Sequence, residues 1–310
     1  MKLVINSAYG YLGATGLTRF ADVHAANEVT RRGRALLDFM CRELAARGVT
    51  LLEADTDGVY FAVPPSFDEA DERRVVAEVA ALLPAKVTLE FEGRYAAMLS
   101  HEPKNYALLG YDGTLVLRGV AFRSRRAEPF GERFLRRALA HLLRDDLQGV
   151  REVYLETVDS IRRRALPRRD LASLVQLSKR PDEYLATREQ RRELGYEALL
   201  GAGITTWNTG ERVHVYRAVG KRAALVPTSR GEGPERDDPR DYDVDYYLRL
   251  LRDTFASRFT RALTSDDFAA VFADASQLSL FAPSLASVKT ILTVISPTPI
   301  TAPGSDLPER

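Results

Sequence analysis

Residues 49–63 read VTLLEADTDGVYFAV, in which two apolar stretches flank Asp55-Thr56-Asp57-Gly58. Two short apolar runs separated by an Asp-Gly signal predict a β-hairpin with this tetrapeptide at its tip. Residues two apart in a strand face one side, so the carboxylates of Asp55 and Asp57 are expected close together. Mg²⁺ neutralises such crowded oxygens and prefers them, together with substrate phosphates, as ligands. The hairpin is therefore a candidate site for two-metal phosphoryl chemistry, although Asp-Gly is also a common turn.

The regions around this hairpin alternate between helical and strand periodicity, which predicts an α+β fold. We predict helices over residues 2–12, 22–47, 68–83, 128–147, 150–164, 185–200 and 246–263. We predict strands over 87–91 and 212–218 and a second hairpin over 106–122. An apolar patch at 288–295 is expected to pair or pack, with no partner evident from the sequence.

Charge is strongly segregated along the chain although the net charge is only +1. The stretch Arg118–Arg169 has fourteen arginines and seven acids, whereas Glu232–Asp245 has seven acids and two arginines. A basic stretch inside a neutral protein favours a local anionic partner, and a solvated helix face is the alternative.

The cysteine and histidine content excludes two structural classes. Cys41 is the single cysteine and there are four histidines, so neither an internal disulfide nor a Cys/His metal cluster is expected. No apolar run approaches the ~20 residues needed to span a bilayer. We therefore expect a cytoplasmic protein without a membrane partner.

Lys2, Asn6 and Tyr9 are spaced so that they share one face of the first predicted helix. A cation, an amide and an aromatic ring on one stripe can contact a phosphate, a sugar and a base. The alternative is a solvated lysine above a half-buried tyrosine.

Four motifs together carry a family resemblance. Residues 2–10, KLVINSAYG, fit the pattern K-x-x-x-N-S-x-Y-G, and Asp55-Thr56-Asp57 resembles D-T-D-S. Residues 104–106, KNY, resemble K-K-x-Y, and residues 243–247, DVDYY, resemble D-V-x-Y-Y. In this order they resemble the C-terminal part of family B DNA polymerases, from the end of the fingers through the palm to the thumb.

The resemblance implies a partial palm, an antiparallel sheet with helices, followed by a mostly helical thumb. The expected divisions are the end of the fingers helix at 1–13, palm at 14–127, thumb at 128–282 and a tail at 283–310. The implied activity is DNA-directed DNA synthesis, in which a nucleotidyl group passes from a dNTP to a primer 3′-OH with two Mg²⁺ ions. The implied partners are primer–template DNA and dNTP, with roles in replication or repair.

The resemblance also implies roles for individual residues. Asp57 would be the principal metal ligand, supported by Asp55. Lys2 would contact the incoming triphosphate, and Asn6 would support that contact. Tyr9 and Gly10 would lie against the nascent base pair. DNA would be bound by Lys104 and Tyr106 in the minor groove near the primer end, and by Arg123 and Arg125 at duplex phosphates.

Three departures from the family pattern qualify this expectation. Gly58 stands in place of the serine of the D-T-D-S motif. Pro103 stands in place of the first lysine of the K-K-x-Y motif. The family's other metal-binding Asp lies upstream of the fingers helix, as does the exonuclease, so this chain alone is expected to be a weak enzyme or none. It could work with a separate chain carrying the N-terminal polymerase half. The alternatives are a non-catalytic DNA-binding remnant and another palm-type enzyme such as a nucleotide cyclase.

A short segment near the C-terminus suggests a further partner. Gln277-Leu278-Ser279-Leu280-Phe281 resembles the Q-L-[SD]-L-F peptide that docks on bacterial sliding clamps. Leu280 and Phe281 would fill an apolar pocket, with Gln277 at its rim. The alternative is that Leu278, Leu280 and Phe281 pack on the thumb.

Overall fold

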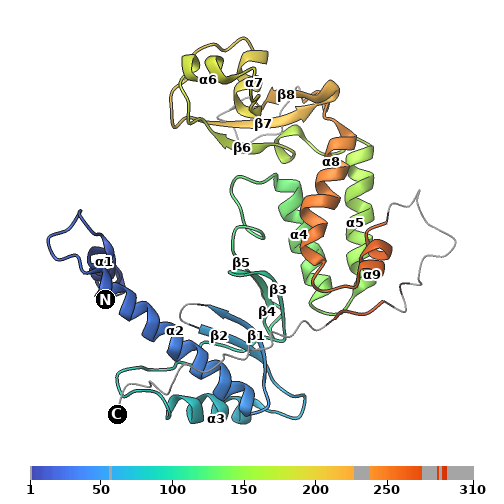
Figure 1. Cartoon of the computed structure of the whole chain (residues 1–310). Helices are drawn as coiled ribbons and strands as arrows, with labels where there is room; N and C mark the ends of the chain where they lie inside the picture. The colour runs from blue at the N-terminus through green and yellow to red at the C-terminus, as the bar shows by residue number, and fades with distance from the viewer. Residues whose placement is uncertain (1, 56–57, 227–237, 274–284, 286–287, 292–310) are drawn as a thin grey trace. The chain divides into compact units, whose positions relative to one another are not determined.

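The computed structural model describes residues 2–55, 58–226, 238–273, 285 and 288–291. They fall into two compact units, one within Met1–Gly93 and the other within Arg94–Leu292 (Figure 1). Helices and three small antiparallel sheets make up the described part, which confirms the α+β prediction.

Two helices begin the first unit, as predicted: α1 (Lys2–Gly13) and α2 (Val23–Ala46). The Asp22 carboxylate accepts from the Ala25 amide at 2.9 Å and caps α2. Gly48, with φ of +82°, follows its last turn, in the conformation that ends many helices. The two helices meet where the Tyr9 hydroxyl lies 2.8 Å from Thr30 Oγ1.

The predicted hairpin is formed by β1 (Thr50–Asp55) and β2 (Gly58–Ala62). Helix α3 (Glu69–Ala80) starts at a capping box in which the Asp68 and Asp71 side chains bond each other's backbone amides. The unit's core contains residues from α2, β1, α3 and the turn before β1: Leu44, Val49, Leu51, Val75 and Val79.

The predicted strand over residues 87–91 is wrong. These residues form an irregular segment with no strand partner in the described chain. The alternating apolar side chains pack on the rest of the unit instead. Leu89 packs on the first unit's core, and the Phe91 ring lies 4.6 Å from the Arg73 guanidinium. One apolar face suffices to hold an extended segment against a core without a ladder of hydrogen bonds.

The second unit begins with a three-stranded sheet, β3 (Ala97–Glu102), β4 (Asn105–Leu109) and β5 (Leu115–Arg118), in that order. The β4–β5 hairpin is as predicted, and β3 was not anticipated. Leu99, Ala107 and Leu117 are buried on this sheet and belong to the same apolar core as the helices that follow.

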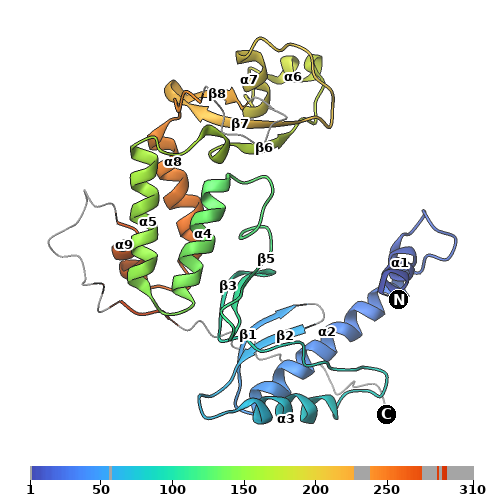
Figure 2. The ribbon, with the colours of Figure 1, turned by 180° about the vertical axis from the view of Figure 1, so that it is seen from behind.

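Those helices are α4 (Pro129–Leu142), α5 (Leu147–Arg162) and α8 (Val244–Leu250), which lie side by side in both views (Figures 1 and 2). The first two confirm the predicted arginine-rich helices. The predicted final helix over 246–263 is wrong in detail: α8 passes into a π-helical turn, Leu251–Phe255, then a 3₁₀ turn, Ala256–Phe259. A further helix, α9 (Ser265–Val271), follows.

Beyond one end of these helices lies the sheet of β6 (Ser173–Gln176), β7 (Arg212–Ala218) and β8 (Arg222–Leu225). Strand β7 is as predicted. The predicted helix over 185–200 is instead α6 (Pro181–Thr187) and α7 (Leu194–Gly201), separated by a polar stretch. Tyr184, Tyr196 and Trp207 form the small core beneath them.

Candidate functional site

The acidic hairpin places Asp55 at the end of β1, half-buried and opposite Gly58. Thr56 and Asp57 connect the two strands and lie outside the described residues. Glu53 is 4% exposed and lies two residues before Asp55, so both carboxylates belong to one side of β1. Glu53 was not predicted as a site residue, although its position two residues before Asp55 indicates that it shares that side of the strand.

The donor chemistry of this strand fits Mg²⁺, which takes carboxylate oxygens. Asp55 can supply one ligand. The described residues contain no cluster of three or more His, Cys, Asp and Glu able to hold a metal, and Asp57 is not among them. The expected proximity of the Asp55 and Asp57 carboxylates therefore stays a prediction.

Helix α1 presents the other predicted residues of the first unit on an open surface. Asn6 and Gly10 are exposed, and Tyr9 is 45% exposed although its hydroxyl is bonded to Thr30. A Cβ added at Gly10 would meet no atom within 4 Å. Lys2 is in the first turn of α1, and its side chain lies outside the described part.

The β3–β4 hairpin holds Lys104 in an unusual backbone conformation. Glu102 pairs with Asn105, so Pro103 and Lys104 form a two-residue turn, and Lys104 has φ of +66°. Proline followed by a residue of positive φ is the signature of a type II turn, whose second central position favours glycine. An L-residue there costs about 1–2 kcal/mol, and such strain is concentrated at functional sites.

Two neighbours brace the Lys104 turn. The Asn105 side chain accepts from the Ala121 amide at 2.8 Å and donates to the Pro103 carbonyl at 3.0 Å. A Cβ at Gly119, where φ is +83°, would lie 2.2 Å from the Lys104 carbonyl oxygen. Only glycine allows this close approach, so Asn105 and Gly119 fix the turn that presents Lys104. Neither was predicted as a site residue.

The remaining predicted DNA contacts lie in the same unit. Tyr106 is half-buried on β4 and pairs with Arg118 of β5. Arg123 and Arg125 are exposed in the segment between β5 and α4. Neither has an ion-pair partner among the described residues, so both present charge to solvent.

Much of the arginine excess that follows has structural roles. Arg133 bonds Asp170 at 2.7 Å and Arg137 bonds Glu156 at 2.6 Å. Arg163 pairs with Asp159, and buried Arg151 donates to the Val271 and Ala273 carbonyls. These four arginines are therefore engaged in contacts within the protein.

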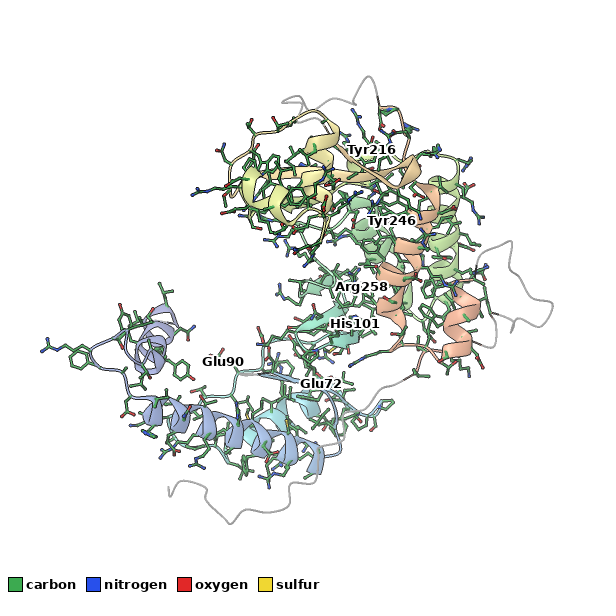
Figure 3. All side chains as sticks on the ribbon, turned by 45° about the horizontal axis from the view of Figure 1, so that its top comes forward. Glu72, Glu90, His101, Tyr216, Tyr246 and Arg258 are labelled. Carbon is green, nitrogen blue, oxygen red and sulfur yellow. The ribbon has the colours of Figure 1, made fainter. Side chains whose placement is uncertain are left out.

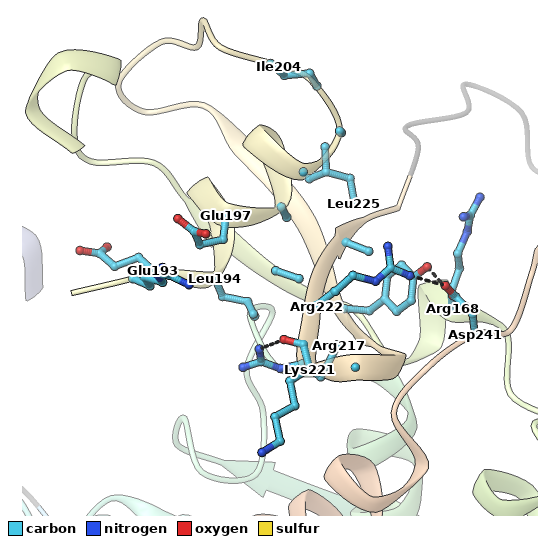
Figure 4. Close-up of a pocket in the computed structure, with 18 of the residues that line it drawn as sticks. Arg168, Glu193, Leu194, Glu197, Ile204, Arg217, Lys221, Arg222, Leu225 and Asp241 are labelled. Atoms are coloured by element: carbon cyan, nitrogen blue, oxygen red, sulfur yellow. Dashed lines mark hydrogen bonds and ion pairs between the residues drawn. The ribbon is translucent and has the colours of Figure 1, made fainter. Parts of the chain in front are cut away.

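A separate cavity of about 1090 Å³ opens beside β7, β8 and α7 (Figure 4). Its carboxylates are engaged: Glu193 bonds Lys179 at 2.8 Å, and Asp241 accepts from Tyr216 at 2.7 Å. The Arg188 guanidinium holds the pKa of Glu197 at about 2. The cavity's cations are Arg168, Arg192, Arg217, Lys221 and Arg222.

The C-terminal predictions divide between described and undescribed residues. Gln277, Leu278, Leu280 and Phe281 lie outside the described part. Of the apolar patch at 288–295, Val288 is buried in the second unit's core and the Ile291 amide donates to the Ala262 carbonyl at 2.9 Å. No helix among the described residues has the length and apolarity to cross a membrane.

Comparisons with known proteins agree with the motif order. The family model for DNA polymerase family B matches residues 1–256. The chain is 28% identical over 258 residues to a DNA polymerase of Pyrococcus horikoshii, covering 78% of this chain and 20% of that protein. It is 26% identical over 263 residues to a DNA polymerase of Pyrococcus glycovorans, covering 80% of this chain and 32% of that one.

A solved structure shows the same fold. It is the family B DNA polymerase of Pyrobaculum calidifontis, with a TM-score of 0.59 and 21% identity, covering 83% of this chain and 32% of that chain. The chain thus spans about a fifth to a third of the length of these relatives. The extent of the family match decides the classification: this chain belongs to DNA polymerase family B.

Proposed function

We propose that this chain contributes the end of the fingers, part of the palm and the thumb to template-directed DNA synthesis. The proposed divisions are 1–13, 14–127 and 128–282, with a tail at 283–310. The observation that carries the proposal is the Lys104 turn, a strained lysine braced at a hairpin tip inside a chain of this family. Nucleotidyl transfer is the activity of the complete polymerase, so the enzyme to assay is the one that contains this chain.

In this proposal Asp57 and Asp55 hold Mg²⁺, which when bound stabilises charge on the transferred phosphate and activates the primer hydroxyl. Asn6, Tyr9 and Gly10 offer an open helix surface to the nucleotide, with Lys2 at its start. Lys104 and Tyr106 orient the primer end. Arg123 and Arg125 bind backbone phosphates, which fix position without reading sequence, as any template requires.

A sliding clamp remains a proposed partner, through Gln277, Leu278, Leu280 and Phe281. A short apolar segment near a chain end can reach such a partner, and the tether would raise the local concentration of DNA. A separate chain carrying the N-terminal polymerase half is a second proposed partner.

Binding to duplex DNA tests the proposal directly. We expect primer–template binding without sequence preference. The logarithm of the association constant should fall by about 0.9 for each phosphate contact when the salt concentration rises tenfold. Two contacts, by Arg123 and Arg125, give a slope of about −2 or steeper. Fluorescence anisotropy measures this slope at salt concentrations from about 50 to about 200 mM, a range over which phosphate contacts change the affinity strongly. Affinity independent of salt would contradict the proposed phosphate contacts.

Lys104→Gly is expected to change stability and DNA binding in opposite directions. Glycine relieves the positive-φ strain, so the second unit should gain about 1 kcal/mol. The lost cation should weaken binding at the primer end roughly tenfold. Denaturant unfolding and anisotropy measure the two effects.

The matched control is Lys104→Ala, which removes the charge and keeps the strain. It should weaken binding equally with no gain in stability. A Lys104→Gly protein that is more stable and binds DNA normally would show that the strained lysine serves another purpose.

A further inference from the structure

Strand β8 has one edge without a strand partner in the described chain, because it is the last in the order β6-β7-β8. The Val226 amide donates to the His214 carbonyl at 2.9 Å, and in an antiparallel pair every second residue then bonds the neighbouring strand. The residues between, Ala223 and Leu225, therefore direct their N–H and C=O groups away from β7. Within the described chain no hydrogen bond to these groups is formed. An unpaired edge of this kind is a template for another extended backbone.

The cavity of about 1090 Å³ lies along this free edge (Figure 4). Helix α7 covers the face of the sheet that carries Leu225, whose side chain packs on the small core of Tyr196 and Trp207. Tyr216 projects from the opposite face, where its hydroxyl donates to Asp241 at 2.7 Å. The lining includes residues of α7 as well as Asp241, so the hollow passes round the edge of β8 from one face to the other.

Gly201, the last residue of α7, leaves the space in front of this edge open. A Cβ added to Gly201 would lie 3.8 Å from the Ala223 carbonyl oxygen and would meet no other side chain of the described residues within 4 Å. A larger side chain would stand in front of this oxygen, where the N–H of an added strand has to lie. Glycine allows such a close approach of a second backbone, so the edge is accessible where α7 ends.

The charge of the cavity favours an acidic occupant. Among the described residues that line it, five cationic side chains outnumber three carboxylates. Glu193 is bonded to Lys179 at 2.8 Å, and Glu197 is bonded to Arg188 at 2.7 Å. Both of those cations lie outside the lining, so two of its carboxylates neutralise none of its positive charge. Arg222 is 69% exposed at the start of β8 and is available to an incoming carboxylate. Complementary charge of this kind selects partners and sets their register.

We propose that an extended, acidic segment of a partner protein binds along β8 as an additional antiparallel strand. Its main-chain groups would bond those of Ala223 and Leu225, the mode in which peptides add to free sheet edges. A phosphate has acceptors but no donors, so a nucleic-acid backbone would leave both outward carbonyls unmet. Tyr216 of this sheet and His101, three residues before the Lys104 turn, lie at separate places in the second unit (Figure 3). The edge is therefore a protein-binding surface beyond the proposed DNA synthesis.

Strand geometry predicts the sequence pattern of the partner, because side chains of an added strand alternate between the two faces of the sheet. On the face of Leu225 they meet an apolar wall that includes Leu194 and Ala198 of α7. On the other face they meet Arg222, which shares that side with Asp241. The segment should thus alternate β-branched apolar residues, which suit strands, with acidic residues. In an antiparallel ladder the apolar residues opposite Leu225 are also those that donate to β8.

The first test titrates the whole chain against a capped, fluorescent peptide in which glutamate alternates with valine. Lysine in place of glutamate reverses the charge, and proline in place of valine removes the N–H groups that the ladder needs. The glutamate peptide should bind about tenfold more tightly than either control. Hydrogen exchange followed by NMR should show that this peptide protects the amides of Ala223 and Leu225. No binding at millimolar peptide, or equal binding of the three peptides, overturns the proposal.

The second test changes the edge itself. Gly201→Leu should weaken binding of the glutamate peptide about tenfold, because leucine stands in front of the Ala223 carbonyl. Gly33→Leu in α2, where an added Cβ meets nothing within 4 Å, is its control. Arg222→Gln should weaken binding about twofold to fivefold. Its control is Arg212→Gln, at an exposed residue of β7 outside the lining.

The same measurements distinguish a protein partner from nucleic acid. Duplex DNA should neither displace the peptide nor protect the amides of Ala223 and Leu225. Thermal unfolding confirms that Gly201→Leu is folded before its affinity is compared. A folded Gly201→Leu protein that binds the glutamate peptide as tightly as wild type shows that the edge is not the binding surface. Displacement of the peptide by duplex DNA, with protection of the same two amides, assigns the edge to nucleic acid and also overturns the proposal.

Discussion

A polymerase containing this chain with Asp57→Asn should lose nucleotide incorporation by on the order of 10²-fold or more. The amide keeps the shape of the carboxylate but removes the negative oxygen that Mg²⁺ requires. Because phosphate and minor-groove contacts are separate from this hairpin, duplex affinity should stay near wild type. Single-nucleotide primer extension at saturating Mg²⁺, with anisotropy beside it, measures both.

Asp112→Asn is the matched control, because Asp112 also occupies a hairpin turn, between β4 and β5, where it accepts from Thr114. It should incorporate nucleotides normally. Asp55→Asn should fall between the two, since Asp55 has the supporting role. If Asp57→Asn binds duplex and extends primers at the wild-type rate, the hairpin is an ordinary turn and the non-catalytic reading of this chain is favoured.

Gly131→Ala should destabilise the second unit by about 2 kcal/mol. A Cβ on this residue of α4 would lie 2.0 Å from Cζ of Phe255, which is 1% exposed and packs edge-on against Phe130 at 5.5 Å. Overpacking a filled core costs about 1–3 kcal/mol, and the gain in helix propensity offsets only part of that. Chemical denaturation monitored at the second unit's transition gives the value.

The control for this substitution is Gly33→Ala in α2, where an added Cβ meets nothing within 4 Å. That change should stabilise its helix by about 0.5–1 kcal/mol. Phe255→Leu should restore part of the stability lost by Gly131→Ala, because the smaller leucine side chain leaves room for the added Cβ. Equal effects of Gly33→Ala and Gly131→Ala would mean that Phe255 moves aside freely.

The elements that the sequence predicted well are those with local causes. The β1–β2 hairpin follows from apolar arms around an Asp-Gly turn, and α2 from an Asp22 cap and a terminal Gly48. Family motifs supplied the candidate residues. For Lys104 the structure adds a strained backbone in a braced turn, which the motif alone did not indicate.

The features that escaped prediction depend on partners distant in sequence. Residues 87–91 alternate like a strand, yet no strand lies beside them in the described chain. Strand β3 was missed because its pattern is weak until β4 pairs with it. His101 and Arg258 gave no signal, since each is ordinary alone and only the fold buries one nitrogen atom of each side chain without a hydrogen-bond partner in the described chain.

The apolar core that the β3–β5 sheet shares with helices α4, α5 and α8 has a consequence for local opening. Leu99, Ala107 and Leu117 of the sheet share this core with Phe134 of α4 and Leu251, which follows α8. The amides of β4 and α4 should therefore exchange with deuterium at similar rates, as one cooperative unit, whereas those of α6 and α7, over their own small core, can open at lower cost. The backbone beneath Lys104 is in this sense as rigid as the helices, and a primer end held there would be held by the most slowly opening part of the unit.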